Sequence, residues 1–134
     1  MVAYLSSSIN LPDYIITIVA ERLHKSGYIT VTSMEEDPWQ PSFKSLNRAE
    51  IRTSDLFIGF QNVYEGDTSL QVHDEWKYAK EMSITCIYIV EKEVLSFDPI
   101  FSKIKKTDDV YILDKITSQE VISIVFGNIT KDTK

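Results

Sequence analysis

The sequence predicts a three-layer α/β domain built on one parallel sheet. The apolar runs at residues 2–5, 55–60 and 84–90 are continuous, as is typical of strands buried on both faces. Segments with the apolar spacing of helices lie between the predicted strands, so strand and helix alternate along the chain. This alternation requires right-handed crossovers that place helices on both faces of the sheet. The simplest arrangement has five strands in the order 2-1-3-4-5.

The first part of the chain is predicted to form a strand, a helix and a second strand. Residues 2–5 are a short apolar strand, and Pro12 fits the start of the helix that follows. Gly27 is placed to end that helix. The apolar stripe of the helix contains Ile15 or Ile16, Val19 and Leu23. Residues 28–32 are rich in β-branched side chains and form the second strand.

The middle of the chain carries the clearest signals. Residues 33–42 form a loop that contains two prolines, and residues 43–52 form the second helix. Residues 55–60 and 84–90 are buried strands, and the helix between them spans residues 71–82. This strand, helix and strand unit is the best clue to function, because ligands of open α/β sheets bind at the carboxyl ends of the strands.

The last part of the chain is less regular. Residues 97–104 hold a short helix, residues 110–113 form the fifth strand and residues 118–126 form the last helix. We therefore expect one domain over residues 1–127, with the flavodoxin-like strand order 2-1-3-4-5. Residues 128–134 are expected to be a frayed polar tail.

Composition excludes several classes of protein. The 134 residues carry 14 basic and 20 acidic side chains, so we expect no nucleic-acid partner, because phosphate backbones require a clustered basic surface. No apolar run approaches the roughly 20 residues that span a bilayer, and the first residues do not have the pattern of a signal peptide. We expect a soluble, cytoplasmic protein with no membrane partner. Cys86 lies in an apolar run and is expected to be a buried side chain rather than a reactive thiol.

Three common sites of α/β proteins do not fit the loops. A receiver domain needs acidic residues after the first strand and an aspartate after the third, where this chain has three serines and Gln61-Asn62. Dinucleotide-binding loops and P-loops need glycines after the first strand, and none of the four glycines lies there. We expect no bound cofactor. We also expect no metal, because His73 is predicted to point away from the core and no second histidine or cysteine is spaced to join it.

Polar side chains follow the first strand. Ser6, Ser7 and Ser8 form a hydroxyl-rich turn before the first helix, where hydroxyls and backbone N–H groups can hold a phosphate or a ribose. The alternative is that Ser8 or Asn10 caps the helix, as at any helix start. The three serines are candidate substrate-binding residues.

The loop after the third strand adds three more candidate substrate-binding residues. Asn62 directly follows the strand, and Tyr64 can line the mouth of the crevice. Asp67 can accept hydrogen bonds from two neighbouring ribose hydroxyls. Gly66-Asp67 is also an ordinary turn pair, so a purely structural role stays open for this segment.

Glu75 is the sharpest candidate of the chain. At about 100° per residue, four apolar residues of its helix share one arc of about 120°: Val72, Trp76, Ala79 and Met82. Glu75 projects onto this arc, which should pack on the sheet, whereas the other charges of the helix project elsewhere. An ionised carboxylate aimed inward costs several kcal/mol unless it is paired or opens into a cleft. It can attack an anomeric carbon or stabilise an oxocarbenium ion, or it can be a structural anchor.

Several segments also resemble known domains. I-R-T-S-D-L-F-I, G-D-T-S, H-D-E-W-K-Y-A and I-T-C-I-Y-I are similar to the pattern of nucleoside 2-deoxyribosyltransferase-like and Toll/interleukin-1 receptor (TIR)-like domains. A-Y-L-S-S-S looks like the first strand of bacterial TIR-like domains. The resemblance covers residues 3–90 and implies that Glu75 is the catalytic glutamate. It also implies that Trp39 contacts the ligand, unless it serves local packing, and that a neighbouring copy of the chain completes the site.

Two functions of different class stay open. The first is an enzyme, an N-glycosidase (a hydrolase) or glycosyl-transfer domain that acts on a nucleoside, a nucleotide or NAD through Glu75. The second is a non-catalytic TIR-like module that binds a nucleotide signal or forms a homo-oligomer, with Glu75 as a structural anchor. The inward direction of Glu75 favours the enzyme, and the lack of a clear general acid or base beside it favours the module.

Overall fold

Five parallel strands lie between two layers of helices in the computed structural model, which describes residues 1–34, 42–97, 99–102, 104 and 109–132. The strands are β1 (Val2–Ser6), β2 (Ile29–Thr32), β3 (Leu56–Gln61), β4 (Thr85–Glu91) and β5 (Val110–Leu113). The helices are α1 (Asp13–Lys25), α2 (Ser42–Arg52), α3 (Leu70–Glu81), α4 (Val94–Phe97), α5 (Pro99–Ser102) and α6 (Ser118–Asp132).

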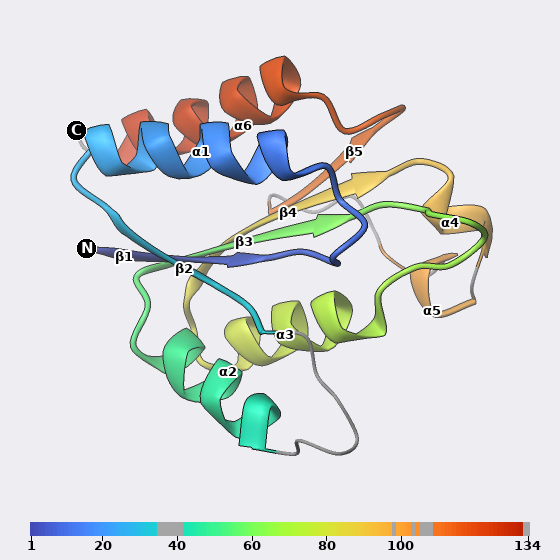
Figure 1. The fold of residues 1–134 in the computed structure, drawn as a ribbon, viewed down its shortest axis with the longest axis horizontal. Helices are drawn as coiled ribbons and strands as arrows, with labels where there is room; N and C mark the ends of the chain where they lie inside the picture. The colour runs from blue at the N-terminus through green and yellow to red at the C-terminus, as the bar shows by residue number, and fades with distance from the viewer. Residues whose placement is uncertain (35–41, 98, 103, 105–108, 133–134) are drawn as a thin grey trace.

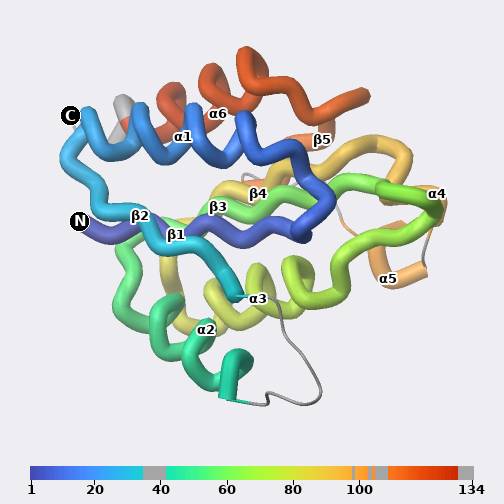
Figure 2. The backbone as a smooth tube through the Cα atoms, viewed as in Figure 1, coloured from blue at the N-terminus to red at the C-terminus, as the bar shows by residue number. Residues whose placement is uncertain are grey.

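The sheet has the order β2-β1-β3-β4-β5. Helices α1 and α6 cover one face, and α2 and α3 cover the other (Figure 1). The three-layer α/β fold and the predicted strand order 2-1-3-4-5 are therefore confirmed. Figure 2 shows the amino end of β1 and the carboxyl end of α6 at one end of the sheet, with the carboxyl ends of the central strands at the other. No helix in the described part of the chain is long and apolar enough to cross a membrane.

The central strands are buried on both faces, which explains their continuous apolar runs. Successive side chains alternate between the two faces. On β1 and β3, Leu5 and Ile58 pack with α1 and α6, whereas Tyr4 and Phe57 pack with α2 and α3. The rings of Tyr4 and Phe57 stack with centroids 5.8 Å apart. Each face of the sheet thus has its own apolar core.

The last helix is longer than the sequence predicted. It continues from Ser118 to Asp132, so residues 128–132 are helical and not a frayed tail. Ile129 is buried because it continues the four-residue spacing of Val121 and Val125. Asn128 accepts a hydrogen bond of 3.0 Å from the Tyr111 hydroxyl and so ties the helix to β5.

Two predictions about the helix that carries Glu75 are wrong. Met82 is 41% exposed because α3 ends at Glu81 and Met82 caps the helix from outside. His73 is buried instead of pointing away from the core, and its ring centroid lies 4.9 Å from that of Phe101. The reason is that α5, in the irregular segment before β5, covers a second side of α3. One helix thus buries two faces, and the inward arc alone does not describe it.

We expect Gly59→Ala to destabilise the protein. A Cβ at Gly59 would lie 3.0 Å from Phe57 Cε1 and 3.2 Å from Tyr88 Cδ1. Overpacking of this kind costs about 1–3 kcal/mol, measurable as a lower free energy of unfolding in urea. Gly127→Ala is the matched control: no atom lies within 4 Å of its Cβ position, and this exposed helical site should gain about 0.5–1 kcal/mol. Equal effects at both sites would contradict the packing of β3.

We expect Cys86 to resist thiol reagents in the folded protein. Burial raises the pKa of this thiol from 9.0 to about 12, with the nearby Asp109 charge adding to the rise and Lys80 opposing it. Because the thiolate is the reactive form, modification at pH 8 should be at least about 100-fold slower than in urea-unfolded protein. Stopped-flow absorbance with a chromogenic disulfide measures both rates. A fast reaction in native buffer would contradict the buried position.

Candidate functional site

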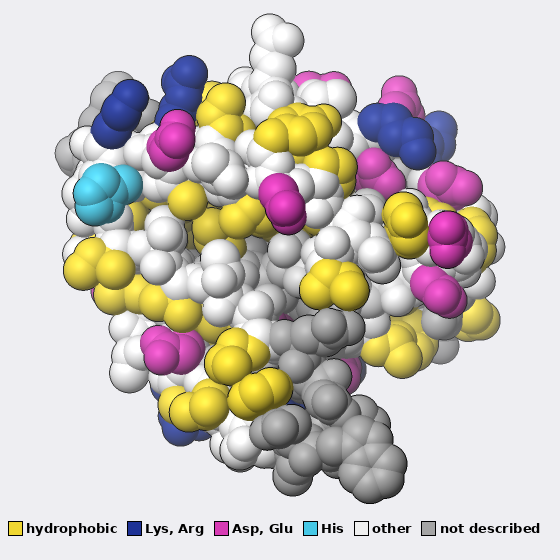
Figure 3. Space-filling view, viewed as in Figure 1, with side chains coloured by type: hydrophobic (Ala, Val, Ile, Leu, Met, Phe, Trp, Pro, Cys, Tyr) yellow, Lys and Arg dark blue, Asp and Glu magenta, His cyan; other side chains and the backbone are white. Residues whose placement is uncertain are grey.

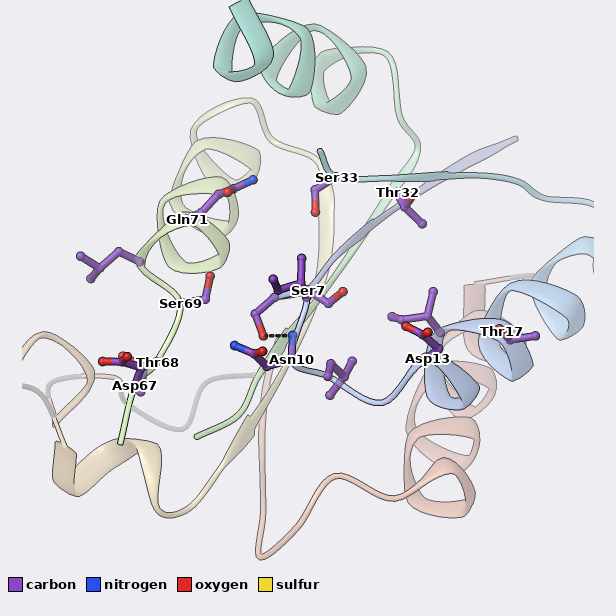
Figure 4. A pocket seen from close by; sticks show the side chains of 15 residues that line it. Ser7, Asn10, Asp13, Thr17, Thr32, Ser33, Asp67, Thr68, Ser69 and Gln71 are labelled. Atoms are coloured by element: carbon purple, nitrogen blue, oxygen red, sulfur yellow. Dashed lines mark hydrogen bonds between the residues drawn. The ribbon is translucent and has the colours of Figure 1, made fainter. Parts of the chain in front are cut away.

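A crevice of about 770 Å³ opens at the carboxyl edge of the sheet. Its walls are the turn after β1, the first turns of α1, the end of β2, and the start of α3 with the loop before it (Figure 4). The helices that follow β1 and β3 lie on opposite faces of the sheet. The crevice therefore lies at the switch point of the strand order, where ligands of open α/β sheets bind.

Hydroxyl groups occur on every wall of the crevice, beside apolar side chains such as Ile9, Leu11 and Ile16. The hydroxyl groups come from all its sides: Ser7, Ser8, Thr17, Thr32, Ser33, Thr68 and Ser69. The charged residues among the lining residues of the described chain are Asp13 and Asp67, and no lysine or arginine belongs to this set. Figure 3 agrees, because the Lys and Arg side chains on this face stay near its margins. The crevice thus combines hydroxyl groups and apolar side chains with negative charge.

Glu75 is buried beside the crevice and is not part of its wall. Its side chain is 4% exposed, which confirms the predicted inward direction. One carboxylate oxygen, Oε1, accepts hydrogen bonds from Tyr4 Oη at 3.0 Å and from Ser6 Oγ at 2.8 Å. The other oxygen, Oε2, accepts one from Gln71 Nε2 at 3.0 Å. These donors offset the cost of taking a carboxylate out of water.

Gln71 connects Glu75 to the end of β2. Its Nε2 also donates to the backbone oxygen of Met34 at 2.7 Å. The buried Asn47 of α2 holds Met34 by both backbone groups, accepting from N at 3.0 Å and donating to O at 2.7 Å. Side chains of α2 and α3, the end of β2 and strand β1 thus share one hydrogen-bond network around the carboxylate.

A second network fixes the start of α3. Gln61, the last residue of β3, accepts from the backbone N of Ser69 and donates to its backbone O, both at 2.7 Å. Ser69 in turn caps α3 by accepting from Val72 N at 3.2 Å. Gln61 also donates to the hydroxyl of Tyr88, which lies 3.2 Å from Nδ1 of His73. Burial raises the pKa of Tyr88, against the opposing effect of its bond with Gln61, so its phenol is neutral near pH 7.

The three predicted serines have different positions. Ser6 is the last residue of β1 and donates to Glu75, so it lies in the strand and not in the turn. Ser7 and Ser8 line the crevice. Ser8 accepts from the Asn10 backbone at 3.3 Å, and neither residue caps α1, whose N-cap makes no side-chain hydrogen bond.

The candidate residues after β3 also differ in position. Asp67 lines the crevice, as predicted for a ligand contact. Its backbone also pairs with that of Tyr64 through bonds of 3.0 and 2.9 Å, closing a tight turn in which Glu65 and Gly66 both have positive φ. Tyr64 itself is exposed and is not among the lining residues, whereas Asn62 accepts from Ser8 Oγ at 3.4 Å. Trp39 lies outside the described residues.

Sequence reasoning missed the donors around Glu75. Tyr4 and Ser6 could have been found by the two-residue period of β1, which places both on the face that α3 covers. Gln71 is four residues before Glu75, so the two side chains are neighbours on the helix surface. Among the described residues, no group of three His, Cys, Asp or Glu side chains is placed to hold a metal ion.

The fold and the crevice define a three-layer α/β protein with a crevice at the switch point of its sheet. No protein-family model and no curated protein sequence matches the chain. Among solved structures, the fold is similar to a 2-desoxiribosyltransferase from Leishmania mexicana, with a TM-score of 0.55 at 12% identity. The match covers 66% of this chain and 63% of that one, less than two-thirds of its length. This likeness shows a shared fold.

We expect Tyr4→Phe to lower the free energy of unfolding by about 1–2 kcal/mol, because the buried carboxylate loses one donor. Phenylalanine keeps the stacking on Phe57, so the change isolates the hydroxyl. Tyr64→Phe is the control, since this exposed tyrosine should change stability by less than about 0.5 kcal/mol. Urea unfolding followed by tryptophan fluorescence measures both. A Tyr4 variant as stable as wild type would show that this bond contributes nothing.

Proposed function

We propose that the protein binds a nucleoside in the crevice and breaks its N-glycosidic bond, with Glu75 as the nucleophile. The observation that carries this proposal is the buried carboxylate of Glu75, held by hydroxyl and amide donors next to a hydroxyl-lined crevice. Burying a carboxylate is costly, and such groups concentrate at functional sites. The fold shared with the 2-desoxiribosyltransferase supports the same class of chemistry.

The reaction needs one carboxylate and one acceptor. An oxygen of Glu75 attacks C1′ of the sugar as the bond from C1′ to the base nitrogen breaks, and the electron pair of that bond goes to the base. The base takes a proton from water as it leaves. Water, or the N–H nitrogen of a second base, then attacks C1′ and gives its proton to the hydroxide left by the first step. The bond from C1′ to Glu75 breaks, which releases the free sugar or the new nucleoside and restores the carboxylate. Water as acceptor makes the protein a hydrolase, and a base makes it a transferase.

The charge of the crevice favours an unphosphorylated nucleoside over NAD or a nucleotide. Its lining residues in the described part of the chain include Asp13 and Asp67 and no cationic side chain, so a phosphate would meet repulsion without a cationic partner there. Hydroxyl groups and carboxylates suit sugar hydroxyls, which both donate and accept. NAD is therefore the second choice of substrate.

A non-catalytic module is the second candidate function. The observation that favours it is the satisfied state of Glu75, whose two oxygens already accept three hydrogen bonds. In that case the carboxylate ties α3 to β1, and the crevice binds a nucleoside or nucleotide signal without changing it. TIR-like self-association would then be the output.

The test is base release from a panel of 2′-deoxynucleosides, ribonucleosides and NAD, followed by liquid chromatography with and without a second free base. We expect release from nucleosides before NAD, and Glu75→Gln should lower the rate by at least about 1000-fold, as for a lost nucleophile. The assay is run at several protein concentrations with size-exclusion chromatography, so that a site completed by a second copy is detected. Binding in a thermal-shift assay without any base release would refute catalysis and support the module.

A further inference from the structure

Gln71 lies between the crevice and the carboxylate of Glu75. Gln71 belongs to the crevice wall, whereas Glu75, one helical turn later, does not. Figure 4 shows the tip of the Gln71 side chain at the edge of α3, on the side of Ser33. Glu75 is nearly inaccessible, and the Gln71 amide that bonds directly to it belongs to a residue of the crevice wall.

The orientation of the Gln71 amide is fixed by its two partners. The backbone oxygen of Met34 and Oε2 of Glu75 both accept, so the NH₂ group, with its two hydrogens, must face them. The turned amide would place its oxygen against two acceptors. The amide is therefore held by hydrogen bonds at two points and not by packing alone.

The two oxygens of Glu75 are held differently. Oε1 accepts from Tyr4 and Ser6, whose side chains are fully buried on β1. Oε2 accepts from Gln71, a half-buried residue in the first turn of α3. Oε1 is thus anchored to the sheet, whereas the Gln71 donor belongs to a side chain outside the fully buried core.

We propose that Gln71 is a movable cover over Glu75, and that Oε2 is the oxygen that meets the ligand once this cover swings aside. The reactive part of this inference rests on the proposed function, whereas the cover is a property of the folded chain itself. A hydroxyl of the incoming sugar takes the place of the Gln71 amide as donor to Oε2. Gln71 is accordingly a positioning residue, and it keeps water from the carboxylate until a ligand arrives.

Carboxylate labelling tests the cover without any need for activity. The folded protein is treated with a water-soluble carbodiimide and an amine, and modification of each carboxylate is followed by peptide mass spectrometry. Glu81, exposed on the same helix, serves as the internal standard. The variants are Gln71→Ala, which removes the cover, and Gln71→Met, which keeps its length without its donors. Gln119→Ala, an exposed glutamine of α6, is the matched control.

We expect Glu75 to react at least about tenfold more slowly than Glu81 in the wild type. The reason is that the two hydrogen bonds of the Gln71 amide must open before the reagent reaches Glu75. Gln71→Ala should speed Glu75 labelling about tenfold and leave Glu81 unchanged, and Gln71→Met should speed it by a smaller factor. Gln119→Ala should change neither rate. Unchanged Glu75 labelling in both Gln71 variants, with unfolding temperatures near that of the wild type, would overturn the inference. If Gln71→Ala does not fold, the methionine variant decides.

Ligand binding separates this inference from the proposed function. Because the ligand no longer has to displace the amide, Gln71→Ala should bind a 2′-deoxynucleoside more tightly, by a few-fold in the dissociation constant, while a purely structural role would weaken binding. Faster labelling of Glu75 together with no base release by the wild type would leave the cover standing and remove the reaction. Base release by the wild type together with unchanged Glu75 labelling in the Gln71 variants would support the reaction and remove the cover.

Discussion

The structure around the crevice depends on one requirement, that a carboxylate buried under a sheet edge keep its hydrogen-bond donors. Glu75 cannot stay ionised in an apolar core without them. Its donors come from β1 and from its own helix, and the amide of Gln71 extends the network to the end of β2. The Glu75 carboxyl thus links α3 to strand β1 and, through Gln71, to one wall of the crevice. The hydrogen bonds that position the site are therefore also bonds that hold this helix layer on the sheet.

Most of the fold could be predicted because it depends on local patterns. Continuous apolar runs marked the central strands, and the alternation of elements limited the topology to one simple strand order. The wrong predictions concern residues whose positions depend on contacts with distant parts of the sequence. His73 is buried by α5, a short helix without a periodic signal. Helix α6 continues past its predicted end because Ile129 packs in the core. The partners in these contacts lie far apart in the sequence, so no local pattern contains both of them.

The candidate site was predictable in part for the same reason. The angle of Glu75 around its helix is a local property, and its burial follows from that angle. The role of Ser6 depended on where β1 ends, and a shift of one residue moved it from the turn into the strand. Gln61 and Asn47 could not have been chosen from sequence, because each acts on the backbone of a residue outside its own helix or strand.

These two amides share a feature with a wider consequence. The Gln61 amide bonds both the N–H and the C=O of Ser69, and the Asn47 amide bonds both groups of Met34. A neighbouring strand would pair with these backbone groups in the same way. Both rims of the crevice are therefore held by side chains that imitate a peptide group. A peptide ladder can be altered only by rebuilding the sheet, but an amide side chain changes with one codon. Evolution can thus widen or narrow this crevice while the five strands stay in place.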